Sequence, residues 1–170
     1  MDLKPYIRNI PDFPKPGVLF RDITPILLRP EVFSYCVETF VTRSRAITPD
    51  LIVAIESRGF IFGPTLAYKM NLPFVPIRKS GKLPYHTEEV KYELEYGSDI
   101  LQIHADAIRP GQRVLLVDDL IATGGTIRAS QNLIEKMGGT VSGVNAVILL
   151  KELCNTEILE AENLFYLVEY

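Results

Sequence analysis

The chain is poor in the residues and segments that build metal centres, disulfide frameworks and membrane spans. It has two cysteines, Cys36 and Cys154, far apart and outside any metal-ligand spacing, so neither structural zinc nor a disulfide framework is expected. No apolar stretch reaches the length of a transmembrane helix, and residues 1–10 carry charges where a signal peptide would be apolar. We therefore expect a cytoplasmic protein that does not contact a membrane.

An excess of positive charge is also missing. The chain has 18 Lys and Arg against 21 Asp and Glu, for a formal net charge of -3. This charge gives no electrostatic basis for binding nucleic acid, so an anion site has to be local, built from a few basic side chains and backbone amides. With 170 residues, of which 47% are hydrophobic, the chain is most simply one domain, residues 1–170.

Residues 114–126 combine a buried strand pattern with polar chemistry. The branched apolar run 114–117 predicts a strand buried on both faces that ends at Asp118 and Asp119, and a turn rich in glycine and threonine, residues 122–126, follows. Ligands of open α/β sheets collect at such strand ends, and the backbone amides and hydroxyls of the turn suit a phosphate. The two carboxylates would repel a bare phosphate, so we expect them to hold sugar hydroxyls, Mg²⁺ or both. The stretch indicates a sugar-phosphate site.

Strand and helix patterns alternate along the rest of the chain, which predicts a right-handed, mainly parallel α/β sheet flanked by helices. A helix begins near Pro30, others follow the first strand and the Gly-rich turn, and the latter helix is expected to end at Gly138 and Gly139. The expected strands span residues 51–55, 74–77, 88–96, 101–103, 114–117, 144–150 and 164–168.

Two further segments carry alternatives that the residues alone leave open. The proline-rich segment 1–30 predicts an ordered, extended arm that either caps the core or covers a ligand. The basic segment 78–86 is either a mobile loop that closes over an anion or a solvated hairpin tip. Arg58, directly after the first buried strand, is either a surface charge or an anion contact.

Together these segments resemble the adenine branch of the type I phosphoribosyltransferase family. Residues 114–126 are similar to the family's motif for phosphoribosyl pyrophosphate (PRPP), and the other matches are residues 13–23, 56–60 and 78–97. The resemblance covers essentially the whole chain and is least diagnostic after Lys151. It implies the type I phosphoribosyltransferase fold with a five-stranded parallel core, a small N-terminal hood at residues 1–30, a flexible hairpin at residues 78–97, and a homodimer.

The resemblance also implies a reaction and the residues that perform it. Adenine and PRPP would give AMP and pyrophosphate, with Mg²⁺ bound chiefly through PRPP or pyrophosphate oxygens rather than by a protein ligand. Asp118 and Asp119 would hold the ribose and favour the cation that develops on it, and a non-proline cis peptide is expected between Glu56 and Ser57. The 5′-phosphate would lie on Ala122, Thr123, Gly124, Gly125 and Thr126. Pyrophosphate would contact Ser57, Arg58, Gly59, Arg78, Lys79 and Lys82.

Recognition of the base depends on the resemblance alone. It places Leu19 and Arg21 of the hood beside adenine, with Leu150 and Tyr96 as further contacts, and gives Glu95 a general acid–base role at the purine. Many family members carry Asp at the position of Glu56, and we expect that exchange to be tolerated.

Two alternative functions differ from this reading. One is a phosphoribosyltransferase for another base, such as hypoxanthine, xanthine or orotate, against which the hood and the sequence Leu94-Glu95-Tyr96-Gly97 argue. The other is a PRPP-sensing regulator of nucleic acid, which would need a basic face or an added DNA-binding segment. The net-acidic chain gives no sign of either feature.

Overall fold

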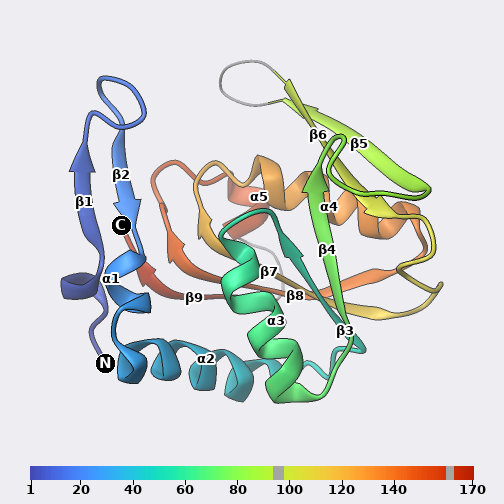
Figure 1. The fold of residues 1–170 in the computed structure, drawn as a ribbon, viewed down its shortest axis with the longest axis horizontal. Helices are drawn as coiled ribbons and strands as arrows, with labels where there is room; N and C mark the ends of the chain where they lie inside the picture. The colour runs from blue at the N-terminus through green and yellow to red at the C-terminus, as the bar shows by residue number, and fades with distance from the viewer. Residues whose placement is uncertain (94–97, 160–162) are drawn as a thin grey trace. The chain divides into compact units, whose positions relative to one another are not determined.

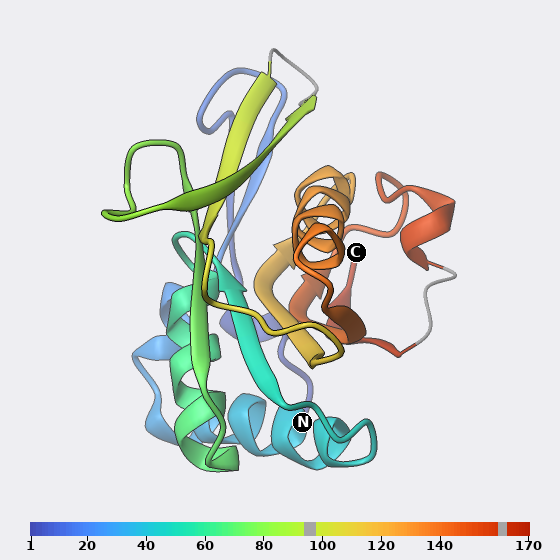
Figure 2. The same ribbon diagram turned by 90° about the vertical axis from the view of Figure 1, so that its right-hand side faces the viewer.

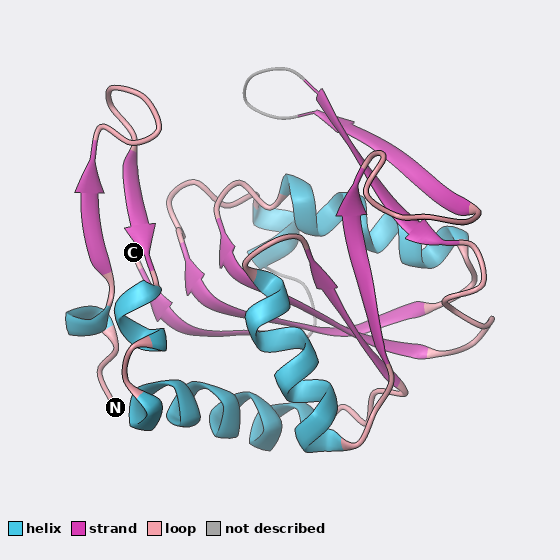
Figure 3. Cartoon of the chain, viewed as in Figure 1, coloured by secondary structure: helices cyan, strands magenta, loops and turns pink. Residues whose placement is uncertain are grey.

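A central sheet organises residues 40–170 (Figures 1 and 3). The computed structural model describes residues 1–93, 98–159 and 163–170, and within these ranges the sheet has seven strands in the order β5-β6-β4-β3-β7-β8-β9. Strands β4, β3, β7, β8 and β9 are parallel, and the antiparallel hairpin β5–β6 pairs with β4. The expected mainly parallel α/β sheet with five parallel strands is confirmed. The strands are β3 (Leu51–Ile55), β4 (Phe74–Lys79), β5 (Thr87–Glu93), β6 (Ser98–His104), β7 (Arg113–Ile121), β8 (Thr140–Leu149) and β9 (Leu164–Glu169).

Helices α3 (Gly59–Met70) and α4 (Gly125–Lys136) lie on opposite faces of this sheet (Figure 2). Central strands therefore need apolar side chains on both sides, and every residue of β3 is buried. Gly63 lets α3 approach closely, because a Cβ at this position would lie 2.4 Å from the Cβ of Ala54. As expected, α4 is followed by Gly138 in the left-handed region, at a φ of 84°.

The order of the strands creates a switch point between β3 and β7. From β3 the chain passes through α3 to β4 on one side, whereas β7, which pairs with the other side of β3, leads through α4 to β8. The two connections run in opposite directions, so the loops that follow β3 and β7 separate at the carboxyl ends of these strands. Open α/β sheets bind their ligands in this type of crevice.

Strand β7 is longer than its apolar run predicts. It continues to Ile121, so the expectation that the strand ends at the two carboxylates was wrong. The reason is one-sided pairing: β7 pairs with β8 as far as Ile121, but with β3 only as far as Val117. Asp118 and Asp119 therefore belong to a strand that has lost one of its two neighbours. Strands β4 and β8 also extend beyond their predicted ranges, to Lys79 and from Thr140.

Residues Met1–Thr39 form a second compact unit. It contains the 3₁₀ helix η1 (Lys4–Tyr6), strands β1 (Arg8–Pro11) and β2 (Leu19–Asp22), helix α1 (Thr24–Leu27) and the first part of α2 (Pro30–Arg45). The two strands are antiparallel, and the short strand expected within residues 17–23 is confirmed as β2. An ion pair of 3.7 Å between Arg8 and Asp22 and an edge-to-face contact between Phe13 and Phe20 connect the strands and their turn.

The two cysteines of the chain lie inside the protein. Cys36 and Cys154 are both buried and free, and burial raises the pKa of the Cys36 thiol to about 11, so it stays protonated at neutral pH. Among the described residues no helix has both the length and the hydropathy that a membrane crossing requires.

Candidate active site

A cavity of about 340 Å³ lies at the carboxyl ends of β3 and β7. Three segments distant in sequence line it: the loop after β3, the end of β7 with the start of α4, and the sheet formed by β4, β5 and β6. The lining residues are Ile55, Glu56, Ser57, Arg58, Lys79, Tyr92, Asp99, Leu101, Asp118, Asp119, Leu120 and Thr126. The cavity therefore brings together Ser57, Arg58, Lys79, Asp118, Asp119 and Thr126 from the predicted site.

The two aspartates, neighbours in sequence, form an acid pair near the end of β7. The Asp119 backbone N–H donates to Asp118 Oδ1 at 2.8 Å, and Asp119 Oδ2 lies 2.9 Å from Arg58 Nε in an ion pair that is not aligned as a hydrogen bond. Burial, followed by the charge of Asp119, raises the pKa of Asp118 well above its ordinary value. Burial also raises the pKa of Asp119, although the charge of Arg58 opposes the shift. Both groups are therefore less acidic than exposed aspartates.

The loop after β3 contains the expected cis peptide between Glu56 and Ser57, which confirms that prediction. Gly59 then begins α3 directly against β7. A Cβ on Gly59 would lie 3.0 Å from the Val117 carbonyl oxygen and 3.1 Å from Asp118 Oδ1. A side chain here would thus push the loop away from the acid pair, which gives Gly59 a steric role.

The basic residues around β4 occupy different positions relative to the cavity. Lys79 lines it, and its Nζ lies 2.8 Å from Asp99 Oδ2. Arg78 and Lys82 are not among the lining residues: Arg78 Nε donates to Glu56 Oε2 at 3.0 Å, and Lys82 is exposed. The resemblance placed all three among the pyrophosphate contacts, with Arg78 helping the two lysines, whereas Lys79 alone of the three lines the cavity.

The turn of residues 122–126 leads into α4. Gly124 has a φ of 86°, a conformation that strains a residue with a Cβ, and its added Cβ would lie 2.7 Å from Ile158 Cγ1. The Asn155 N–H donates to the Thr123 carbonyl at 3.0 Å. The turn is therefore supported by Asn155, which directly precedes the short helix α5 (Thr156–Leu159), and by Ile158 within that helix. Sequence reasoning missed them because their contacts are tertiary and follow no local pattern.

Other predicted residues lie away from these contacts or outside the described ranges. The Leu150 N–H donates to the Ile121 carbonyl at 2.8 Å, so Leu150 follows β8 beside the end of β7. In the N-terminal unit, Leu19 is exposed and the Arg21 guanidinium donates to the Asn9 side chain. Glu95 and Tyr96 lie outside the described residues. Glu56, Tyr92 and Asp99 line the cavity without having been predicted as site residues.

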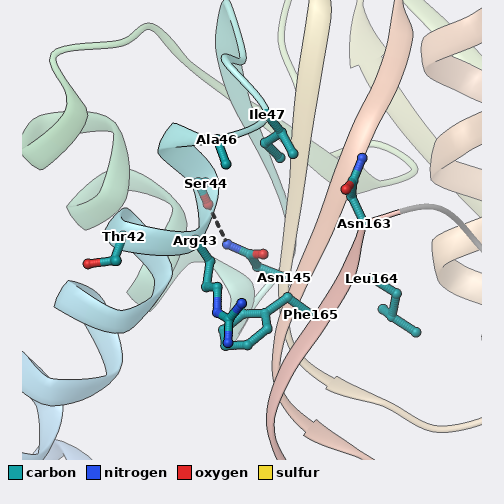
Figure 4. Close-up of a pocket in the computed structure, with 9 residues that line it drawn as sticks. All are labelled: Thr42, Arg43, Ser44, Ala46, Ile47, Asn145, Asn163, Leu164 and Phe165. Carbon is teal, nitrogen blue, oxygen red and sulfur yellow. Dashed lines mark hydrogen bonds between the residues drawn. The ribbon is translucent and has the colours of Figure 1, made fainter.

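A larger cavity of about 570 Å³ lies elsewhere, between the end of α2 and the strands β8 and β9 (Figure 4). At its base Asn145 Nδ2 donates to Ser44 Oγ at 2.8 Å, and the Arg43 guanidinium stacks 5.0 Å from the Phe165 ring. These polar groups therefore interact with other groups of the protein. The smaller cavity contains the acid pair and the cations, so we assign the chemistry to it.

Comparisons with known proteins agree with this assignment. Residues 32–161 match the model of the phosphoribosyl transferase domain. An adenine phosphoribosyltransferase of Carboxydothermus hydrogenoformans is 51% identical over 170 residues, which cover 100% of each chain. The crystal structure of adenine phosphoribosyltransferase from Thermoanaerobacter pseudethanolicus superposes with a TM-score of 0.94 at 47% identity, over 99% of this chain and 98% of that one. The enzyme of Saccharomyces cerevisiae, complexed with D-2,5-dideoxy-2,5-imino-altritol 1,6-bisphosphate and adenine, gives a TM-score of 0.90 at 39% identity, over 98% and 96% of the two chains.

The parallel sheet, the acid pair and the glycine-rich turn at the switch point define a type I phosphoribosyltransferase. Identity of about half the residues over the full length makes the assignment more specific. The chain belongs to the adenine phosphoribosyltransferase family, and the resemblance seen in the sequence is confirmed.

Proposed function

We propose that the protein transfers the 5-phosphoribosyl group from PRPP to adenine and forms AMP and pyrophosphate. The observation that carries the proposal is the acid pair Asp118–Asp119 at the switch point, beside the turn of residues 122–126, in a chain of this family. The reaction makes the protein a transferase of purine salvage. Membership in an enzyme family argues against a PRPP-sensing regulator, and full-length identity with adenine enzymes argues against another base.

The 5′-phosphate would bind at the start of α4. Helix α4 has 12 residues, and its first N–H groups, with the Thr123 and Thr126 hydroxyls, can donate hydrogen bonds to phosphate oxygens. Gly124 adopts the left-handed conformation that aims this turn. Support from Asn155 and Ile158 would hold the turn in shape before the substrate arrives, which reduces the entropy lost on binding.

The acid pair would act on the ribose. Its carboxylate oxygens can accept hydrogen bonds from the two ribose hydroxyls, and its negative charge favours the positive charge that develops on the sugar as the bond to pyrophosphate breaks. Because the raised pKa values of Asp118 and Asp119 come from burial, ionised carboxylates here are poorly solvated. Their interaction with a nearby cationic sugar is correspondingly stronger than it would be in water.

Pyrophosphate leaves toward the loop after β3 and the end of β4. Ser57, Arg58 and the Gly59 N–H would contact it from one side, and Lys79 and Lys82 from the other. Arg58 and Lys79 already hold the carboxylates of Asp119 and Asp99, so pyrophosphate oxygens would exchange with those groups. The exchange lets the protein hold both basic side chains close to the reaction without a ligand.

The oxygen-rich cavity fits a magnesium complex of PRPP. Asp118 and Asp119 supply the carboxylate oxygens that Mg²⁺ accepts, but Asp119 is already paired with Arg58, so we assign most Mg²⁺ ligands to PRPP and water. When bound, the ion offsets negative charge on the pyrophosphate group. The protein's own contribution is the orientation of the ribose and of the two basic groups.

Recognition of adenine is the part of the proposal that depends most on the family. Leu19, Arg21, Leu150 and Tyr96 would surround the base, and Glu95 would manage a proton as N9 attacks the sugar. The yeast family member that binds adenine, at 39% identity, supports the choice of base. The N-terminal hood over the base, a mobile hairpin at residues 78–97, a homodimer and a cytoplasmic location remain predictions.

A coupled assay tests the function directly. Purified protein with PRPP and Mg²⁺ is incubated with adenine, hypoxanthine, guanine, xanthine and orotate, and pyrophosphate release and nucleotide formation are measured. We expect AMP from adenine and no product from the other bases. A double variant, Asp118→Asn with Asp119→Asn, should remain folded by circular dichroism and lose activity. Product formation from another base but not from adenine, or an active double variant, would contradict the proposal.

A further inference from the structure

Glu56 connects two loops that approach the cavity from different strands. Its Oε2 accepts hydrogen bonds from Arg78 Nε at 3.0 Å and from the Lys79 backbone N–H at 3.2 Å, and its Oε1 accepts one from Arg78 Nη2 at 3.4 Å. Glu56 is the first residue after β3, whereas Arg78 and Lys79 end β4. One carboxylate thus fixes the distance between the loop after β3 and the last residues of β4.

Arg78 extends this connection into the following turn. Its Nη1 donates to the Lys82 carbonyl at 3.0 Å, and the Lys82 N–H donates back to the Lys79 carbonyl at 3.3 Å. The Gly81 N–H donates to the Gln102 side chain at 3.0 Å, so β6 holds the same turn. The path therefore runs from Glu56 through the guanidinium to the turn that carries Lys79 and Lys82.

We propose that Glu56 and Arg78 form a positioning clamp, in which Arg78 orients the turn of Lys79 and Lys82 instead of contacting pyrophosphate itself. The inference deepens the proposed function and rests on it, because the clamp would act on the basic groups that receive pyrophosphate. It also changes the role of Arg78, which the sequence resemblance placed among the direct substrate contacts.

The contacts of Arg78 argue for the indirect role. Three of its nitrogens donate to protein oxygens, two to Glu56 and one to the Lys82 carbonyl, in the fork geometry that only a guanidinium provides. Its charge is offset by Glu56, and it does not line the cavity, whereas Lys79 does. Burial opposes ionisation of Glu56, but the hydrogen bonds from Arg78 and the Lys79 N–H lower its pKa, so it stays ionised at neutral pH.

Removing the charge of Glu56 distinguishes the two possible roles of Arg78, direct contact with pyrophosphate and positioning of the turn. If Arg78 contacted pyrophosphate directly, Glu56→Gln would release it for that task, and binding of magnesium pyrophosphate would stay equal or become tighter. If the clamp positions the turn, binding of magnesium pyrophosphate and the KM for PRPP should both weaken by about tenfold, within the coupling range of contacting residues. The KM for adenine should change less than about twofold under the same argument. Calorimetry with magnesium pyrophosphate and steady-state kinetics measure these values.

Two substitutions at Arg78 sharpen the test. Lysine keeps the charge but lacks the fork, so Arg78→Lys should lose nearly as much pyrophosphate affinity as Arg78→Gln. The double variant Glu56→Gln with Arg78→Gln should lose little more than either single variant, because each breaks the same clamp. Near-normal affinity in Arg78→Lys, or losses that add in the double variant, would overturn the proposal. Glu56→Asp keeps the charge with a shorter reach and should restore part of the loss seen in Glu56→Gln.

Arg113 provides a matched control at the opposite end of the sheet. Its guanidinium donates to the carbonyls of Ile47 at 2.7 Å and Thr48 at 3.3 Å, beside the start of β7. Arg113→Gln should lower thermal stability without changing pyrophosphate affinity or the KM for PRPP. The variant therefore shows that a loss of stability alone does not change these two values. The wild-type assay with adenine is run alongside. No AMP from the wild type would refute the proposed function, whereas normal wild-type turnover with unchanged Glu56→Gln binding would refute the clamp alone.

Discussion

Lys79 and Asp99 form an ion pair of 2.8 Å between β4 and β6 at the edge of the active-site cavity. The hydrogen bond to Asp99 raises the pKa of Lys79, and the same bond lowers the pKa of Asp99. Both groups are therefore charged at neutral pH. Without a ligand, the lysine that we assign to pyrophosphate holds a carboxylate of its own protein.

Asp99→Asn should tighten the binding of magnesium pyrophosphate. The Lys79 side chain is 56% exposed, so the pair stabilises the folded protein by about 1 kcal/mol at most, and the gain in affinity should be about two- to fivefold. Calorimetry measures it. Glu88→Gln is the control. Glu88 forms an ion pair of 2.6 Å with Lys136, and neither residue lines the cavity. Weaker binding in Asp99→Asn would instead mean that Asp99 holds Lys79 in its productive position.

Asp118→Asn should abolish turnover yet raise stability at neutral pH. Burial raises the pKa of Asp118 in the folded protein, so the folded state binds more protons than the unfolded state between the two pKa values, and stability falls as pH rises through that window. The neutral amide of the variant does not ionise, so it does not lose stability in this way. At pH 7 the Tm of the variant should be a few degrees above that of the wild type, since 1 kcal/mol corresponds to roughly 2–4 °C for a chain of this size. Near pH 4 the two Tm values should be similar. Scanning calorimetry at both pH values tests it; a Tm below wild type at pH 7 would contradict it.

Gly124→Ala should weaken AMP binding through two separable effects. The φ of 86° strains alanine by about 1–2 kcal/mol, and the new Cβ would also meet Ile158. Gly111→Ala isolates the first effect, because Gly111 has a φ of 84° and nothing within 4 Å of its added Cβ. Adding Ile158→Ala should relieve the second. If Gly124→Ala cost no more stability than Gly111→Ala and bound AMP as tightly as the wild type, α5 would have no part in supporting the turn.

Glu95→Gln should reduce kcat by about 10²–10⁴-fold while PRPP binding stays nearly constant, as the loss of a general acid–base group does. Rapid-quench kinetics separates the chemical step from product release. The Glu88→Gln variant serves as control, because Glu88 does not line the cavity. Unchanged turnover in Glu95→Gln would assign the proton transfer to another group.

Several elements of the fold were predictable because their signals are local. Apolar runs marked β3 and the first part of β7, and the Gly138-Gly139 pair marked the end of α4. The extension of β7 through the acid pair was not predictable, because it depends on β8 continuing to pair after β3 has ended.

In the candidate site, too, some residues could be predicted from the sequence and others could not. The acid pair and the turn follow one another in sequence, so a motif could identify them. The partners of the cations could not be identified by a local pattern: Glu56 and Arg78 are 22 residues apart, and Asp99 reaches Lys79 from another strand. Likewise, Ile158 meets Gly124 only because the segment after β8 folds back over the turn.

Paired charges around the cavity affect which anions can enter. Arg58, Arg78 and Lys79 each hold a carboxylate, so a small monovalent anion such as chloride gains little attraction there and must compete with a fixed one. A polyanion that offers several oxygens at once can replace Asp99 and Asp119 together. The site therefore exchanges anions instead of accumulating them, and it should discriminate against the simple salts that surround a charged metabolite in the cell.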